Sequence, residues 1–222
     1  MKDVTLVIPA KFESESLPKV LSELRKIPVK KIIVMPKSDV LTYNSAKNYN
    51  CKIIFQKTSG YGSAISQGIL SVKTKYFCIF NADGAFNPKY LKKMRSLLNK
   101  KNDFVFNTRY HKKAGSDDDT ILTYIGNKIF TLLCNILFQL NISDVLFTYV
   151  MGYTKAFRSL KIKSKNFSFC IELPIKAKFM NYNLTTLPSY ERSRIAGKKK
   201  VNEFKDGFLI LISILTLFIF RK

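Results

Sequence analysis

The chain has 222 residues, of which 46% are hydrophobic. This length allows one large domain, or one domain with an appendage, and its apolar side chains can fill a core, which excludes an intrinsically disordered chain. The 38 Lys and Arg residues outweigh the 15 Asp and Glu residues and give a formal net charge of +23. This charge predicts an anionic partner: nucleic acid, an anionic lipid surface or a phosphorylated substrate.

Strands and helices alternate through the first half of the chain. Apolar β-prone runs are followed by segments with apolar residues at helical spacing. The expected strands are 4–8, 31–35, 53–55, 76–80 and 103–108, and the expected helices are 17–27, 42–48, 63–72 and 88–99. This alternation predicts an α/β fold with a mostly parallel sheet flanked by helices. Ligands of such sheets bind at the carboxyl ends of the strands, which directs attention to the loops that follow them.

The second half of the chain is organised differently. A polar segment, 115–120, interrupts the alternation of strands and helices. Beyond it we expect a long apolar helix at 121–142, an apolar helix around 171–179, a short strand at 184–187 and a basic stretch at 192–200. No internal repeat and no clean linker is evident.

Two apolar segments bear on membrane association. Segment 121–142 is long enough to span a bilayer, but its polar residues are costly in hydrocarbon, so we expect a buried or interfacial helix. Segment 208–220 is too short for an upright span and is expected to be an interfacial anchor. A terminal helix packed on the core or at a dimer contact is the alternative for this segment. The polar residues of segment 121–142 are Asn127, Lys128, Asn135 and Gln139. Arg221 and Lys222 follow segment 208–220, and we expect these two cations to lie at the lipid headgroups.

The cysteines and the N-terminal residues predict the cellular compartment in which the protein lies. The cysteines lie far apart, without a Cys-x-x-Cys pair, and we expect buried free thiols, as in a reducing environment. A β-prone run begins at Val4, so no signal peptide is expected and the protein is predicted to be cytoplasmic. The cysteines are Cys51, Cys78, Cys134 and Cys170.

The segment Asn81-Ala82-Asp83-Gly84 directly follows the strand expected at 76–80. A carboxylate and an amide two positions apart at a strand end can both face a hard cation. Proteins hold Mg²⁺ or Mn²⁺ with one or two carboxylates together with phosphate oxygens. Asp83 and Asn81 are therefore candidate metal ligands, and a plain turn is the alternative interpretation.

Two other segments are candidates for ligand contact. Gly60-Tyr61-Gly62-Ser63-Ala64 opens a helix, where backbone N–H groups can approach a phosphate or sugar, or where small residues let the helix pack on the sheet. The segment Pro9-Ala10-Lys11-Phe12-Glu13 places Glu13 just past the first strand. An acid there can accept hydrogen bonds from a ribose or base, or can stabilise the start of a helix.

The basic stretch at 192–200 has Arg and Lys side chains that suit one or two phosphate groups. A solvated basic loop is the plain alternative. A segment that binds nucleic acid is another, but it would leave the glycine-rich segment and the Asn81–Gly84 turn without a role. Nucleic acid is therefore not expected as a partner.

Taken in order, these segments resemble the family 2 glycosyltransferases of GT-A (Rossmann-like) fold. The resemblance is strongest to the group of dolichyl-phosphate mannose synthase and the bacterial polyprenyl-phosphate glycosyltransferases. It implies a GT-A domain at 1–207 and an apolar membrane-associating tail at 208–222. Besides the segments above, it rests on Asp103, Thr108-Arg109-Tyr110, Asp144, Glu172-Leu173 and Arg194…Gly197…Lys200.

The resemblance also implies roles for individual residues. A first set would contact the nucleotide-sugar donor: Pro9, Ala10, Glu13, Asp39, Gly60, Gly62, Asn81 and Asp83. A second set would act in catalysis or meet phosphates of the donor or the acceptor: Asp83, Arg109, Asp144, Glu172, Arg194 and Lys200. Asp83, which belongs to both sets, and Asn81 of the first set would hold Mg²⁺ or Mn²⁺.

Three positions depart from the family pattern. Asn81 stands where the family has the first acid of Asp-x-Asp, so the metal would depend more on the donor phosphates. Segment 35–39 lacks the paired acids that many relatives carry after the second strand, with Asp39 as a candidate substitute. Phe12 occupies the place of a common Asn beside Glu13.

The function implied is metal-dependent, inverting hexosyl transfer in cell-envelope biogenesis. The donor would be a UDP- or GDP-sugar and the acceptor a polyprenyl (dolichyl or undecaprenyl) phosphate. The reaction would take place at the cytoplasmic face of a membrane, and the protein could act as a monomer or as a homo-oligomer. An anionic acceptor needs no general base, so His111 need not be catalytic. Two alternatives stay open: a same-fold enzyme acting on a sugar, lipid or protein hydroxyl with Asp144 or Glu172 as base, and a non-catalytic membrane-bound relative.

Overall fold

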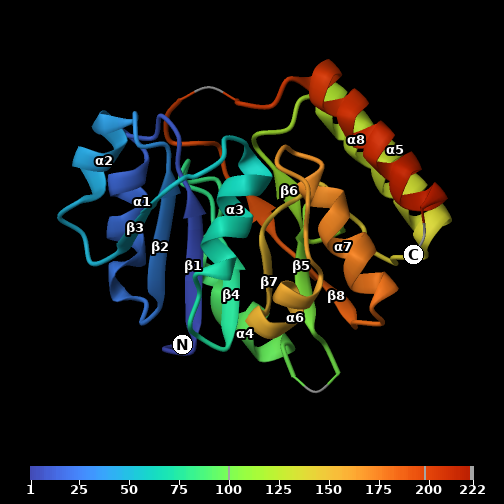
Figure 1. The fold of residues 1–222 in the computed structure, drawn as a ribbon, viewed down its shortest axis with the longest axis horizontal. Coiled ribbons are helices and arrows are strands. Elements are labelled where there is room, and N and C mark those ends of the chain that lie inside the picture. The colour runs from blue at the N-terminus through green and yellow to red at the C-terminus, as the bar shows by residue number, and fades with distance from the viewer. Residues whose placement is uncertain (100, 198, 221–222) are drawn as a thin grey trace.

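The fold is built on a sheet of seven strands in the order β3-β2-β1-β4-β7-β5-β8 (Figure 1). The computed structural model describes residues 1–99, 101–197 and 199–220. In the large sheet β7 runs antiparallel to β4 and β5, and the other neighbouring strands are parallel. The strands are β1 (Val4–Pro9), β2 (Lys30–Met35), β3 (Lys52–Phe55), β4 (Tyr76–Ile79), β5 (Phe104–Thr108), β7 (Val150–Tyr153) and β8 (Leu184–Pro188).

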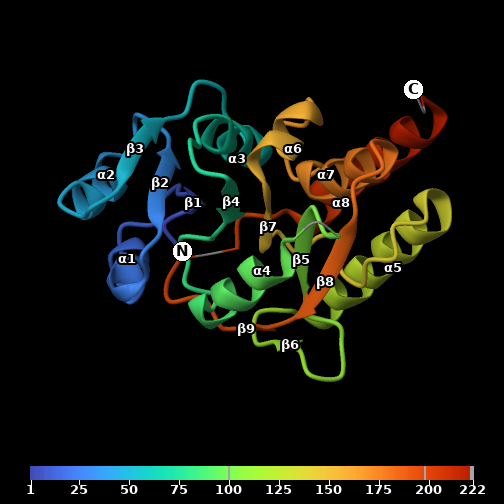
Figure 2. The ribbon, with the colours of Figure 1, turned by 90° about the horizontal axis from the view of Figure 1, so that it is seen from below.

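Helices cover both faces of the sheet, which confirms the predicted fold class. In Figure 2, α3, α6 and α7 lie on one side of the strands, and α1 and α4 lie on the other. The helices are α1 (Leu17–Glu23), α2 (Val40–Ala46), α3 (Tyr61–Leu70), α4 (Leu91–Leu97), α5 (Ile121–Phe138), α6 (Thr154–Ser159), α7 (Phe169–Phe179) and α8 (Glu203–Ile219). Short 3₁₀ turns at Leu24–Lys26 and Pro88–Tyr90 follow α1 and precede α4.

Each face of the sheet has its own apolar core because successive side chains of a strand point to opposite faces. On β1, Val7 packs with the residues under α3 and α7, whereas Leu6 and Ile8 pack with those under α1 and α4. Gly68 of α3 lies so close to β1 that an added Cβ would stand 2.3 Å from Val7 Cγ1. Small residues in α3 thus let this helix pack tightly on the sheet.

Several elements differ from the sequence prediction. The antiparallel strand β7 was not predicted, and neither was the small parallel sheet formed by β6 (Gly115–Ser116) and β9 (Tyr190–Glu191). Helix α5 ends at Phe138 rather than at residue 142, because Gln139 and Asn141 take left-handed backbone conformations with φ of 53° and 56°. Helix α8 begins at Glu203, where the side chain of Asn202 caps it, before the apolar run starts.

Helices α5 and α8 pack on each other (Figure 1). Both helices also expose apolar side chains to solvent. In α5 only Thr131, Cys134 and Phe138 are buried, so this is a surface helix rather than a core helix. Within the described chain, α5 alone meets the length and hydropathy expected of a membrane-crossing helix, which on its own is weak evidence. The predicted headgroup cations Arg221 and Lys222 lie outside the described residues. The exposed apolar side chains, called here the apolar face, are Ile121, Leu122, Ile125, Ile129, Leu132, Ile136, Phe204, Phe208, Leu211, Ile212, Leu215, Phe218 and Ile219.

Candidate active site

A cavity of about 420 Å³ lies at the carboxyl ends of β1 and β4, where the topology predicts ligand binding. Its walls come from the loops after these strands, the start of α3, and the segments that follow β6 and β9. Side chains from α5 and α8 complete it. The predicted site residues that line it are Pro9, Ala10, Glu13, Gly60, Asn81, Asp83, Arg109, Arg194 and Lys200.

The turn after β4 presents Asp83 to this cavity. Its carboxylate Oδ1 accepts a hydrogen bond from the N–H of Ala85 at 3.0 Å, while no described residue donates to Oδ2. Gly84 next to it has φ of 85°, a conformation that favours glycine. Burial raises the pKa of Asp83, and the nearby carboxylates Glu13 and Asp118 raise it further against the hydrogen bond from Ala85 and the charge of Arg194. A bound cation would relieve this unfavourable burial of charge.

Tyr61 joins the start of α3 to the turn after β4. Its hydroxyl donates to Asn81 Oδ1 at 3.2 Å and lies 2.7 Å from Thr148 Oγ1. Gly60 precedes the helix with φ of 117°, and a Cβ there would meet the carbonyl of Lys165. The glycine therefore lets the 165 loop pack against the helix start, and Tyr61 then reaches the cavity.

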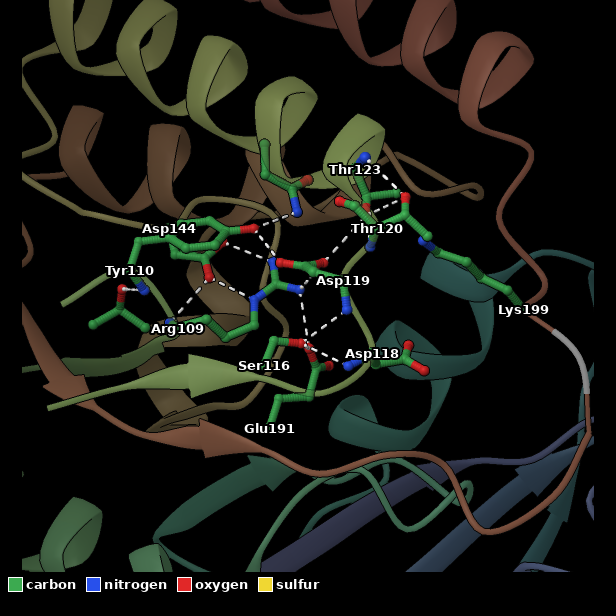
Figure 3. A network of polar contacts seen from close by, with 12 residues as sticks. Arg109, Tyr110, Ser116, Asp118, Asp119, Thr120, Thr123, Asp144, Glu191 and Lys199 are labelled. Atoms are coloured by element: carbon green, nitrogen blue, oxygen red, sulfur yellow. Dashed lines mark hydrogen bonds and ion pairs between the residues drawn. The ribbon is translucent and has the colours of Figure 1, made fainter. Parts of the chain in front are cut away.

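Arg109 is the centre of a buried polar network beside the cavity (Figure 3). Its guanidinium forms a two-point contact with Asp144, at 2.8 and 3.1 Å, and also contacts Asp119 at 3.1 Å and Glu191 at 3.2 Å. Burial disfavours the charged form of Arg109, but the neighbouring carboxylates outweigh this and raise its pKa. In this structure Arg109 thus lines the cavity with its guanidinium paired with three carboxylates.

Cations of the basic stretch pair with acids across the cavity. Arg194 contacts Asp118 through Nε at 3.0 Å and Nη2 at 2.5 Å, and Lys200 Nζ forms an ion pair with Glu13. Glu13 is also fixed by Ser16, whose hydroxyl donates to it at 2.5 Å. Charges of both signs therefore alternate along the wall that holds Asp83.

Comparison with known proteins shows the family of the chain. The family model described as Glycosyl transferase family 2 matches residues 5–161. The chain belongs to this family. It is 25% identical over 214 residues to a dolichyl-phosphate hexose transferase of Haloferax volcanii, covering 96% of this chain and 92% of that protein. It is also 25% identical to an uncharacterized glycosyltransferase of Mycobacterium tuberculosis, over 94% of both chains.

Solved structures share the fold of this glycosyltransferase. Glucosyl-3-phosphoglycerate synthase from Mycobacterium tuberculosis, in complex with Mn²⁺, UDP and glucosyl-3-phosphoglycerate, matches with a TM-score of 0.76 at 14% identity. The match covers 97% of this chain and 79% of that one. Mannosyl-3-phosphoglycerate synthase from Rubrobacter xylanophilus matches with a TM-score of 0.69 at 12% identity, over 96% and 72% of the two chains. These matches support the GT-A fold of this hexosyltransferase.

Four predicted site residues of the glycosyltransferase do not line the cavity. Asp39 caps α2 by accepting from the N–H of Thr42 at 3.3 Å, and it also accepts from the N–H of Phe12 at 2.6 Å. Gly62 is buried against the 164–166 backbone. Asp144 is fully buried on Arg109. These contacts give Asp39, Gly62 and Asp144 packing or anchoring roles in this structure.

Glu172 is the fourth residue away from the cavity. Its carboxylate accepts from the N–H groups of Lys163 and Ser164 at 2.9 and 2.7 Å and pairs with Lys176 at 2.6 Å. Burial by itself would raise the pKa of Glu172, but the hydrogen bonds from Lys176, Ser164 and Lys163 outweigh it, and the pKa is lowered. Glu172 thus anchors the loop that packs on Gly60.

Several cavity residues were not predicted as site residues. Glu191 follows β8 in sequence as one acid among basic residues, and the pairings of β5 with β8 and of β6 with β9 bring it to Arg109. Asp118 and Asp119 belong to the polar segment 115–120, where a run of three acids in a strongly basic chain was the available signal. Thr148 stands in a segment without any recognisable pattern.

The described residues partly suit the divalent cation that the family implies. Asp83 offers a carboxylate oxygen without a hydrogen-bond donor, and Asn81 offers an amide oxygen on the same turn. Within residues 1–99, 101–197 and 199–220, no three His, Cys, Asp or Glu side chains are grouped as metal ligands. The donor set fits Mg²⁺ or Mn²⁺ held by few protein oxygens, with phosphate oxygens as further ligands.

Proposed function

We propose that this glycosyltransferase moves a hexose from a UDP- or GDP-sugar to a polyprenyl phosphate at a membrane surface. The observation that carries the proposal is that α5 and α8, the two helices that bear the apolar face, also contribute side chains to the cavity wall. Thr123 and Asn127 of α5 and Ile210 of α8 line the cavity that also holds Asp83. A lipid lying along the two helices could therefore present its phosphate to the donor site.

The relatives and the charges support the same proposal. The Haloferax volcanii protein is named a dolichyl-phosphate hexose transferase, and it aligns with nearly the whole chain. A membrane-bound acceptor also fits the net charge of +23, since a basic protein is attracted to an anionic lipid surface. We therefore assign residues 1–207 to catalysis and 208–222, together with α5, to contact with the cytoplasmic face of the membrane.

The donor would occupy the end of the cavity that holds Asp83. Pro9, Ala10 and Glu13 would lie against the nucleoside, and Arg194 and Lys200 would receive the diphosphate. Asp83 and Asn81 would hold Mg²⁺ or Mn²⁺, which supplies positive charge for the leaving diphosphate. An acceptor phosphate is already anionic, so its oxygen can attack the anomeric carbon without a protein base, with inversion of configuration.

Transfer to a hydroxyl acceptor is a second candidate, favoured by one observation. Glu191 lines the cavity, and burial raises its pKa despite the opposing charge of Arg109. A carboxylate with a raised pKa suits a general base. Solved structures of the same fold include a glucosyl-3-phosphoglycerate synthase in complex with phosphoglyceric acid.

The proposal is tested by transfer assays with purified protein. UDP- and GDP-sugars with a labelled hexose are incubated with Mn²⁺ and either undecaprenyl phosphate, dolichyl phosphate, undecaprenol or phosphoglyceric acid. The proposal expects label in an alkali-stable, organic-soluble lipid phosphate and none in the undecaprenol sample. Label in undecaprenol or phosphoglyceric acid, with none in either lipid phosphate, would establish the hydroxyl acceptor instead.

A further inference from the structure

Residues 192–197 and 199–201, called here the basic strap, run along the cavity and are attached to the turn of Asp83. The N–H of Ile195 donates to the carbonyl oxygen of Asp83 at 2.8 Å, and that of Arg192 donates to Ala85 at 3.0 Å. The Ile195 side chain also packs on Gly84, where a Cβ would stand 2.4 Å from its Cδ1. Because Ile195 is hydrogen-bonded to Asp83, the backbone of its neighbour Arg194 is held close to the Asp83 turn.

The strap's cations are engaged by carboxylates of the chain itself. Arg194 forms a two-point contact with Asp118, and these side chains are only 22% and 21% exposed. All four members of the two ion pairs, including Glu13 and Lys200, line the cavity. The cations that suit a diphosphate are thus occupied before any donor arrives.

The segment 115–120, called here the acidic loop, directs three consecutive acids to three different places. Asp117 accepts from the hydroxyl of Tyr190, Asp118 meets Arg194, and Asp119 meets Arg109. Pairing of β6 with β9 holds the start of the loop, and the hydroxyl of Ser116 accepts from the N–H of Asp118 at 3.1 Å. The position of Asp118 is therefore fixed by the fold, whereas, among the residues that the structure describes, its side chain is bound by Arg194 alone.

We propose that Asp118 is an exchange partner in the donor site, a role that rests on the proposed function. Without ligand, Asp118 holds Arg194. When the divalent cation and the nucleoside diphosphate bind, Arg194 turns to the phosphates and Asp118 turns to the cation. Asp118 then supplies the second carboxylate that the Asn81-Ala82-Asp83 turn lacks.

The charges along the wall give the reason for this exchange. Asp118 is paired with Arg194 and Glu13 with Lys200, and Asp83 lies close to both acids. A diphosphate alone would have to displace Asp118 and Glu13 from these cations, and a divalent cation alone would compete with Arg194 for Asp118. Binding of the two together satisfies both sets, so each should strengthen binding of the other.

Titration of the full chain with Mn²⁺ alone, followed by electron paramagnetic resonance, isolates Asp118 from catalysis. Arg194→Gln releases Asp118, and we expect its Mn²⁺ affinity to rise by about fivefold, the lower end of ordinary coupling. Asp118→Asn should lower the affinity. Arg192→Gln is the matched control, because Arg192 belongs to the same strap but pairs with Glu23.

The double variant separates direct contact from a general change in charge. If Asp118 reaches the cation, the gain from Arg194→Gln disappears when Asp118→Asn is added. A gain that persists in the double variant, or that Arg192→Gln reproduces, would overturn the exchange. Unchanged Mn²⁺ affinity in Arg194→Gln would also overturn it, and this variant keeps the test open if Asp118→Asn fails to fold.

A second titration separates this inference from the proposed function. Calorimetry with UDP and with GDP, in EDTA or in Mn²⁺, should show the wild type binding one nucleotide more tightly with Mn²⁺. In Asp118→Asn we expect tighter binding in EDTA and a metal effect smaller by about tenfold, while Asp117→Asn keeps the wild-type effect. A full metal effect in Asp118→Asn contradicts the exchange alone. Absence of nucleotide binding in the wild type, with Mn²⁺ present, contradicts the proposed function itself.

Discussion

Asp83 combines a free carboxylate oxygen with partial burial and a fixed turn. The N–H of Ala85 holds one oxygen, and the strap binds the carbonyl oxygen of the same residue. Neither contact needs the charge of the carboxylate to keep the fold. A substitution of Asp83 can therefore change function without a large loss of stability. A substitution of Arg109 cannot, because its guanidinium pairs with three largely buried carboxylates.

We expect Asp83→Ala to abolish transfer and leave the fold intact. Loss of the carboxylate removes the anchor for the donor diphosphate, and losing one such electrostatic group lowers kcat by roughly 100-fold or more. Initial rates with the labelled donor measure the effect, and circular dichroism reports the fold. Asp117→Ala, a neighbouring acid outside the cavity, should keep wild-type rates. Normal turnover in Asp83→Ala would refute the assigned site.

Arg109 should act chiefly on stability. Arg109→Gln leaves Asp144, Asp119 and Glu191 buried without their cation, and breaking such a network costs about 3–5 kcal/mol. Urea unfolding at neutral pH measures this loss. Arg192→Gln breaks the more exposed pair with Glu23 and a hydrogen bond to the carbonyl oxygen of Phe86, and should cost only about 1–2 kcal/mol. Equal stability of the two variants would contradict the anchoring role of Arg109.

At the scale of the element, α7 positions the glycine-rich start of α3 indirectly. Glu172 in the first turn of α7 binds the 163–164 backbone, and the loop that follows packs on Gly60. The acid that the family resemblance placed near the acceptor is thus bonded to backbone in this structure. Its effect on activity would pass through the position of Tyr61.

Glu172→Gln should lower the free energy of unfolding by about 1–3 kcal/mol at neutral pH. The pKa of Glu172 is lowered in the fold, so its stabilisation is present above the unfolded pKa of about 4.3 and is lost as pH falls through the folded value. Urea unfolding at pH 7, 5 and 3.5 should therefore show the two proteins converge at the lowest pH. Glu15→Gln, an exposed acid, should differ from wild type at none of these. A constant gap would rule out ionisation as the cause.

Elements with regular patterns were predictable, and elements defined by distant partners were not. The strand at 104–108 and the helix at 169–179 follow from runs of apolar residues. Strand β7 is four residues long and contains Gly152, whose missing side chain lets Phe104 of β5 pack closely. The reason for the glycine is thus the neighbouring strand, which the local sequence does not reveal. In the same way, Asp83 was predictable from its turn, while Glu191 and Asp118 reach the cavity through the pairings of β5 with β8 and of β6 with β9.

For the whole molecule, the apolar face sets the orientation at a membrane. Helices α5 and α8 lie together at one end of the molecule, and α2 lies at the opposite end (Figure 1). Lys128 of α5 and Lys205 of α8 are exposed on these two helices. Apolar insertion and attraction to anionic headgroups would therefore act on the same side of the protein.

Leu132→Glu tests this orientation, because Leu132 is 60% exposed on α5 and makes little contribution to the core. Burying a leucine contributes about 1.5–3 kcal/mol, so its loss should weaken partition into anionic liposomes by more than about tenfold. Co-sedimentation with phosphatidylglycerol vesicles measures this partition. Leu41→Glu is the matched control, since Leu41 is 73% exposed on α2 at the far end. Transfer to a short-chain, water-soluble polyprenyl phosphate should be the same in both variants, because neither residue lines the cavity. Equal liposome binding by the two variants would place the membrane contact elsewhere. Loss of transfer to the soluble acceptor in Leu132→Glu would show that Leu132 affects the shape of the cavity rather than the contact with the membrane.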